Sequence, residues 1–183
     1  MSRWLLTISA ALMAASLLAA CGGRDDSTGI SEVDAVVEAV LDRDTRALVS
    51  LLKYESVECT FEDSGGVPEP PRCQAGQSDG TAVEAIVGGA CEGVYVAQSQ
   101  APSFLQQLVE GVKLRLYAVY GTESLPERPD YTLLFSVGGN ARIDGVVFGV
   151  MSGGISSATT SCGPLADVAQ SLEAEQADIL VAR

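Results

Sequence analysis

Residue character alternates regularly between positions 112 and 120 of this chain. Every second residue in this run is apolar or aromatic: Val112, Leu114, Leu116, Ala118 and Tyr120. Successive side chains of a β-strand point to opposite faces of the sheet. The pattern therefore predicts a strand that presents these five side chains to one face.

Further strand candidates lie on both sides of this run. The turn-forming residues Gly138-Gly139-Asn140 separate the candidates 131–137 and 142–150, and a loop with prolines precedes residue 131. Short connections of this kind predict an antiparallel meander. The segments expected as strands are 131–137, 142–150 and 155–160, with 81–87 and 93–97 as shorter candidates.

Helical periodicity marks the first part of the chain after residue 30. Apolar residues at i, i+3, i+4, i+7 and i+8 between Val33 and Leu41 predict an amphipathic helix. Ser31 is its expected N-cap, with Asp34 in the position of a capping box. Asp44 is expected to cap a second, shorter helix that contains Leu48, Leu51 and Leu52.

Two more helices are predicted further along the chain. Pro102 is suited to the first turn of a helix that ends near Gly111. Gly163-Pro164 precedes a terminal helix whose apolar face is expected to extend from Leu165 to Leu180. Residues 55–80, which are rich in acids, Gly and Pro, are expected to form a loop.

The order of these elements predicts an α+β fold. It has an N-terminal helical pair, an antiparallel β-meander with helices on one face, and a C-terminal helix.

The first 21 residues form a separate segment. Arg3 supplies a positive charge, residues 4–18 are apolar or small, and Leu18-Ala19-Ala20-Cys21 follows. The apolar run is shorter than the ~20 residues of a transmembrane helix, and it has the organisation of an export signal. The four residues ending in Cys21 resemble the lipobox of bacterial lipoproteins. An uncleaved anchor and an ordinary secreted protein are the alternatives.

The lipobox resemblance implies cleavage before Cys21, a diacylglyceryl thioether on its sulfur, and acylation of the new amine, for example by palmitate. The expected organisation is a signal peptide at 1–20, a lipidated tether at 21–29 and a single domain at 30–183. The domain would face the extracytoplasmic side of a cell membrane or outer membrane. The resemblance does not distinguish between the two membranes.

Charge and cysteine content agree with this location. Residues 21–183 have 10 Lys and Arg against 24 Asp and Glu, a formal charge of −14, which excludes a basic nucleic-acid surface. The expected attachment to the membrane is therefore the lipid on Cys21, because an anionic bilayer repels this surface.

The other cysteines are even in number, which predicts disulfides in an exported domain. Three pairings are possible among them, and we favour Cys59–Cys73 and Cys91–Cys162. Zinc is the rival interpretation. The chain has no histidine and no C-x-x-C pair, so we expect neither a metal nor a cofactor.

Residues 36–52 look like the N-terminal helices of the NTF2-like (cystatin-like) superfamily, with Ala47-Leu48 and Leu51-Leu52 in the second helix. The C-terminal helix and the Cys-rich loop depart from that family. The resemblance implies a curved sheet around a pocket, and some members resemble ketosteroid isomerase, which uses an Asp base and a Tyr donor. The candidates for those roles are Asp144, Tyr117, Tyr120 and Tyr131. Tyr117 and Tyr120 differ in parity, so we expect them on opposite faces of their strand.

The sequence says least about the molecular activity of the protein. Without histidine there is no Ser-His or Cys-His pair, and no catalytic motif is present. We therefore expect a protein that is not an enzyme and that binds a small ligand or another envelope protein. An isomerase-type pocket enzyme and a carrier of an apolar ligand are the alternatives.

Overall fold

The computed structural model describes residues 27–182 except 63–64, 91–92, 123–124, 126–127 and 139–143. The helices in this part of the chain are α1 (Ser31–Asp42), α2 (Thr45–Ser50), α3 (Ala101–Val109) and α4 (Leu165–Ala174). The strands are β1 (Glu55–Glu58), β2 (Ala82–Gly89), β3 (Val94–Ala97), β4 (Lys113–Gly121), β5 (Tyr131–Gly138), β6 (Gly145–Met151), β7 (Gly154–Thr160) and β8 (Asp178–Ala182). The predicted α+β class is confirmed.

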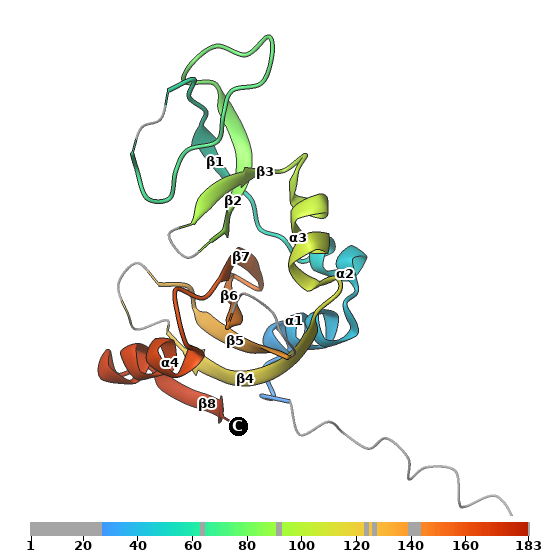
Figure 1. Cartoon of the computed structure of the whole chain (residues 1–183), viewed down its shortest axis with the longest axis vertical. Coiled ribbons are helices and arrows are strands. Elements are labelled where there is room, and N and C mark those ends of the chain that lie inside the picture. Colours follow the sequence, from blue (N-terminus) through green and yellow to red (C-terminus); the bar gives the residue numbers. More distant parts are fainter. Residues whose placement is uncertain are drawn as a thin grey trace, which may run out of the picture.

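The strands form a single sheet with the order β1-β2-β7-β6-β5-β4-β8, and β3 also pairs with β2. The predicted meander is the antiparallel run from β4 to β7. Its connection to the earlier strands is parallel, because Val87, Gly88 and Gly89 of β2 pair with residues 157–159 of β7. Residues 55–99, which we call the lobe, extend from this junction and form the upper end of the molecule in Figure 1.

The larger core lies between the meander and the first three helices. The valines of α1 and Leu105 of α3 pack against Leu133, Phe135 and Phe148 of the sheet, all of them buried. Phe135 and Phe148 meet edge to face with ring centroids 5.8 Å apart. The buried side chains of this core, in the described part of the chain, are apolar. Ile86 and Val96 of the lobe belong to the same core.

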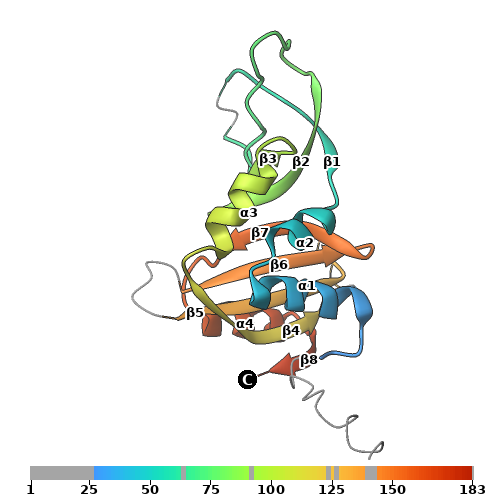
Figure 2. The ribbon, with the colours of Figure 1, turned by 90° about the vertical axis from the view of Figure 1, so that its right-hand side faces the viewer.

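A smaller core lies on the opposite face of the sheet. Leu165, Ala169 and Leu172 of α4 pack against Ala118, Tyr120 and Leu134. Figure 2 shows α1 and α2 in front of the sheet and α4 behind it. The first three helices thus share one face, as expected, whereas the C-terminal helix covers the other.

A β-bulge in β4 corrects the expected distribution of its side chains. The register shifts between Leu116 and Ala118 where β4 pairs with β5. Leu114 and Leu116 therefore face the larger core, whereas Ala118 and Tyr120 face the smaller one. One extra residue reverses the alternation of a strand. The prediction of a single shared face was wrong for this reason.

The end of the chain also differs from the prediction. Helix α4 ends at Ala174, and the expected helical residues Ile179 and Leu180 belong to strand β8, which pairs with β4. The helix stops because Gln176 takes a left-handed conformation with φ of 68°, and the Ala177 N–H donates to the Leu172 carbonyl at 3.0 Å. This is a Schellman-type ending without its usual glycine, so no residue at this position marks the end of the helix.

The start of α1 differs in its capping. The helix begins at Ser31, but the Asp34 carboxylate reaches back beyond it and accepts bonds from the Thr28 N–H and hydroxyl, at 2.7 and 2.8 Å, and from the Gly29 N–H. Although partial burial acts to raise the pKa of Asp34, these hydrogen bonds outweigh it and hold the pKa below its usual value. The expected cap of α2 is confirmed, since Asp44 Oδ1 accepts the Ala47 N–H at 3.0 Å.

Candidate functional site

The residues proposed from the isomerase resemblance do not come together. Tyr117 and Tyr120 both pack in the smaller core, so the expectation that they point to opposite faces was wrong; the bulge lies between Leu116 and Ala118. Tyr131 packs against the larger core on the other face. Asp144 is exposed and precedes β6, six positions along the ladder from Tyr131, or about 20 Å at the usual rise per residue.

Tyr120 has a structural contact instead. Its hydroxyl donates to Glu173 Oε1 of α4 at 3.0 Å, and its side chain is buried against the helix. Burial raises the pKa of Tyr120 to about 12, with the Glu173 hydrogen bond and charge acting in the same direction. This contact fastens α4 to β4. A second contact joins the end of α4 to the β4–β5 connection, because Arg128 Nη2 donates to both carboxylate oxygens of Glu175, at 2.8 and 2.9 Å.

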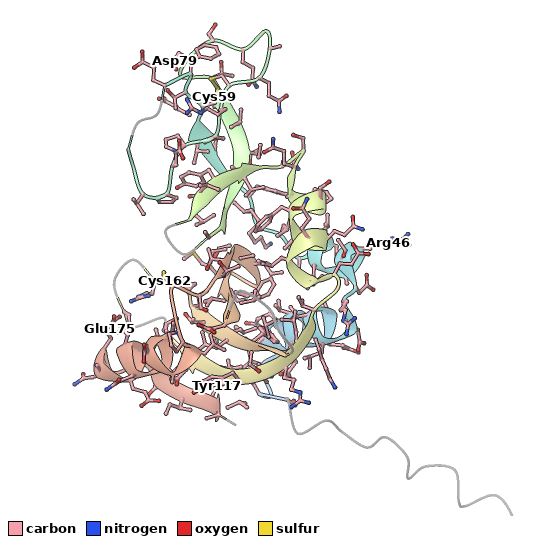
Figure 3. All side chains as sticks on the ribbon, in the orientation of Figure 1. Arg46, Cys59, Asp79, Tyr117, Cys162 and Glu175 are labelled. Carbon is pink, nitrogen blue, oxygen red and sulfur yellow. A yellow bond between two sulfur atoms is a disulfide. The ribbon has the colours of Figure 1, made fainter. Side chains whose placement is uncertain are left out.

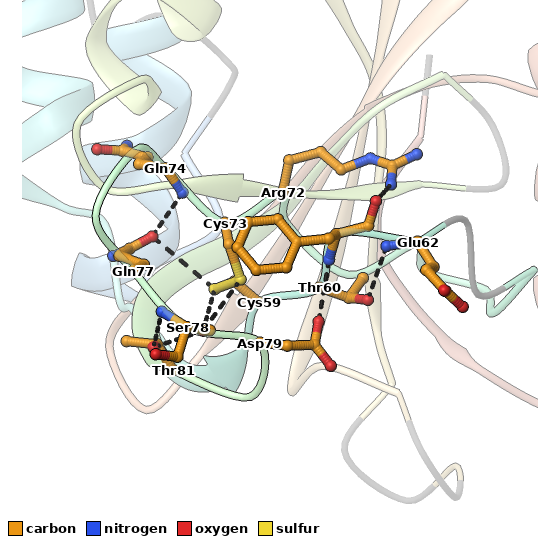
Figure 4. Close-up of a disulfide and its surroundings, with 11 residues drawn as sticks. Cys59, Thr60, Glu62, Arg72, Cys73, Gln74, Gln77, Ser78, Asp79 and Thr81 are labelled. Atoms are coloured by element: carbon orange, nitrogen blue, oxygen red, sulfur yellow. Dashed lines mark hydrogen bonds between the residues drawn. A yellow bond between two sulfur atoms is a disulfide. The ribbon is translucent and has the colours of Figure 1, made fainter.

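The lobe is built around a disulfide between Cys59 and Cys73, which confirms the first predicted pairing. The Cys59 N–H donates to the Thr81 carbonyl, and the Gly80 N–H donates back to the Cys59 carbonyl. Figure 4 shows the polar contacts around the bridge, among them Arg72 Nη1 donating to the Phe61 carbonyl at 2.7 Å. Residues 55–58, expected as loop, form β1 because Val57 and its neighbours pair with β2.

A cavity of about 240 Å³ opens on the lobe beside β3. It lies between this strand and the Pro-rich segment that precedes Cys73. Drug-sized ligands occupy pockets of about 300 Å³ or more, so this cavity is suited to one or two side chains. Its lining residues are Glu69, Pro70, Pro71, Arg72, Gln74, Val94, Tyr95, Ala97 and Gln100.

The walls of the cavity combine apolar and hydrogen-bonding groups. Val94 is 39% exposed, whereas Pro71 is buried. Gln74 Nε2 donates to the hydroxyl of Ser99 at 3.4 Å. Burial raises the pKa of Tyr95, and the nearby Glu55 carboxylate adds to this effect, so its phenol is neutral at physiological pH.

Sequence reasoning missed these residues as a site. Pro68, Pro70 and Pro71 were interpreted only as markers of a loop, and the segment 93–97 only as a short strand. The signal available was the Pro-Pro pair itself, because a proline beside a strand cannot continue a hydrogen-bonded ladder. The partner strand could not be identified from the sequence.

The other sequence-based sites remain predictions. Cys21 and Cys91 lie outside the described residues, so neither lipidation nor a Cys91–Cys162 bridge is tested by the geometry. In the part of the chain that the structure describes, no cluster of His, Cys, Asp or Glu is arranged to hold a metal. No helix within residues 27–182, outside the gaps given above, has the length and apolar character to cross a bilayer.

No protein-family model and no curated protein sequence matches this chain. Solved structures do match. One is Rv0760c from Mycobacterium tuberculosis, with 10% identity, coverage of 76% of this chain and 97% of that one, and a TM-score of 0.37. Another is an LEH-like epoxide hydrolase from the same organism, with 12% identity, coverage of 81% and 92%, and a TM-score of 0.33.

These TM-scores are below 0.5, so the similarities assign neither a family nor an activity to this chain. They do correct one prediction. The expectation that the chain is not an enzyme rested on the absence of histidine and of a catalytic motif, and it is contradicted by the match to an enzyme, the LEH-like epoxide hydrolase.

Proposed function

We propose that this chain is a lipid-anchored protein of the cell envelope that binds a partner or ligand at the β3 cavity. The observation that carries the proposal is the cavity itself, which combines Tyr95, Val94 and the Pro70-Pro71 pair with the polar Gln74 and Gln100. Binding sites typically place a few polar groups around an apolar surface in this way.

The position of the lobe supports the same function. Residues 27–30, where the predicted tether enters the domain, lie at the lower end of the molecule beside β8, and the lobe lies at the upper end (Figures 1 and 2). A lipid on Cys21 would therefore hold the lower end near the bilayer. The cavity would then be accessible from the side away from the membrane.

The anchor is tested by the variant Cys21→Ser in cells given a labelled palmitate analogue. We expect the variant to lose both the label and its partition into the detergent phase. The control variant Cys162→Ser keeps the lipobox and should retain both. Continued membrane partition of Cys21→Ser would overturn the anchoring part of the proposal.

The binding site is tested by photo-crosslinking in intact cells with a benzophenone residue at position 100, on the cavity rim. Position 46 serves as the control, because Arg46 is exposed on α2 and is not one of the lining residues (Figure 3). We expect a defined adduct from position 100 that disappears when Gln74→Trp fills the cavity mouth. Equal adducts from both positions, or an adduct insensitive to Gln74→Trp, would refute binding at the cavity.

A further inference from the structure

The outer edge of β3 begins a hydrogen-bonded ladder that stops after one step. The Tyr95 N–H points away from β2 and donates to the Glu69 carbonyl at 2.8 Å, in a parallel bridge between Glu69 and Val94. On its other edge β3 pairs with β2 from Val94 to Ala97. Because backbone groups alternate between the two edges, the Tyr95 carbonyl and the Ala97 N–H also point outward.

Position 71 is where the next step of this ladder would fall. In a parallel ladder, residue 71 would donate its N–H to the Tyr95 carbonyl and accept the Ala97 N–H. Pro71 has no N–H, and its carbonyl accepts the Thr60 N–H at 3.0 Å instead. The Pro-Pro segment therefore turns away from β3, and the cavity lies in the space that this leaves.

Two backbone groups of β3 consequently face the cavity without a partner from the described part of the chain. An unpaired strand edge is a template for another extended backbone. Peptide recognition by strand addition uses such an edge for affinity and an adjacent pocket for one side chain. Here the pocket that Val94 and the prolines form lies directly beside the open edge.

Charge indicates which kind of segment fits. Between residues 55 and 99 the sequence has eight Asp and Glu and one basic residue, Arg72, so this 45-residue lobe has a formal charge of −7. Arg72 is already engaged with the Phe61 carbonyl and, at 3.8 Å, with Glu69. The negative charge of the lobe should speed association with a positively charged partner and disfavour acidic partners.

We propose that the β3 edge binds an extended, positively charged segment of a partner protein by strand addition, with one apolar side chain in the cavity. The inference rests on the proposed binding function and names the chemistry of its partner. One residue of that segment, opposite Val96, satisfies both the Tyr95 carbonyl and the Ala97 N–H. It takes the place that Pro71 leaves open.

The test uses acetylated ten-residue peptides of alternating Lys and Val as probes for the folded domain. We expect measurable binding, slower hydrogen exchange of the Ala97 amide, and loss of binding when alternate peptide nitrogens on the pairing edge are methylated. Methylation on the opposite edge is the matched control and should have little effect. A peptide of alternating Glu and Val should not bind.

The protein variants are Ala97→Pro, which removes the outward N–H, and Ala97→Ser, which retains it. Loss of this hydrogen bond should weaken binding about ten-fold, and Ala97→Ser should bind like the parent chain. If Ala97→Pro does not fold, the two methylated peptide series still decide the question. Equal binding of both series, or of the acidic peptide, would overturn strand addition.

Failure of this inference can be separated from failure of the proposed function. If the crosslink from position 100 persists and responds to Gln74→Trp, but the peptides bind without regard to methylation, the cavity binds its partner without strand addition. If the crosslink is absent as well, the binding function itself is wrong.

Discussion

Burial and the neighbouring Glu173 carboxylate both raise the pKa of the Tyr120 hydroxyl group. The phenol is enclosed between β4 and α4, and it donates to Glu173 at 3.0 Å. Its folded-state pKa of about 12 exceeds the value of 10.0 expected for the unfolded chain. The folded protein therefore holds this proton more tightly than the unfolded chain does.

The variant Tyr120→Phe should consequently change how stability depends on pH. The contribution of this group is complete below pH 10 and is lost as the pH rises through about 12. We expect Tyr120→Phe to unfold with about 1 kcal/mol less free energy at pH 7 and to lose stability less steeply between pH 10 and 12. In a pH titration followed by absorbance at 295 nm, the tyrosine step at the highest pH should also disappear in this variant.

Tyr117→Phe is the matched control, because Tyr117 lies in the same small core and is only half-buried. It should leave the late titration in place. A parent chain whose tyrosines all titrate near pH 10 would contradict the assignment.

At the scale of elements, sequence periodicity predicted most of the helices and the meander. It failed where a backbone irregularity has no side-chain signature. The bulge near Tyr117 reversed the faces of β4, and the left-handed Gln176 ended α4 early. The cavity could not be predicted either, because it depends on which strand lies beside Pro71, and pairings between distant segments are not encoded in local periodicity.

The disulfide of the lobe was predictable, because a mostly polar loop rich in Gly and Pro cannot hold itself together by apolar packing and is stabilised by a covalent closure. Its removal in the double variant Cys59→Ser, Cys73→Ser should cost about 3 kcal/mol in the chain-entropy description, given the separation of 14 residues. We expect hydrogen exchange to accelerate in the lobe while the amides of β4–β7 stay protected. A uniform acceleration over the whole domain would show that the bridge supports more than the lobe.

The second predicted bridge, Cys91–Cys162, can be tested with the first one intact. The parallel register places Gly89 opposite Thr159, so the chain leaves these two paired strands close to both cysteines in sequence. Mass spectrometry of a non-reduced digest should find a peptide pair that joins the two. Alkylation of either residue without prior reduction would refute this pairing.

At the scale of the whole molecule, residues 27–30 and the lobe lie at opposite ends (Figures 1 and 2). This arrangement predicts the orientation of the lipidated protein on phosphatidylcholine vesicles with a nitroxide quencher on the headgroups. A fluorescent residue at position 182, in β8, should be quenched more strongly than one at position 75, in the lobe; both positions are exposed. Stronger quenching at position 75 would mean that the lobe lies against the bilayer.

The position of β8 has a practical consequence for studying the protein in cells. This strand is the edge of the sheet beside the segment 27–30 (Figure 1). Under the proposed lipid anchor, a reporter fused directly after it would lie between the domain and the bilayer. A small epitope inserted in the exposed turn at residues 75–76 would be accessible to antibodies from outside.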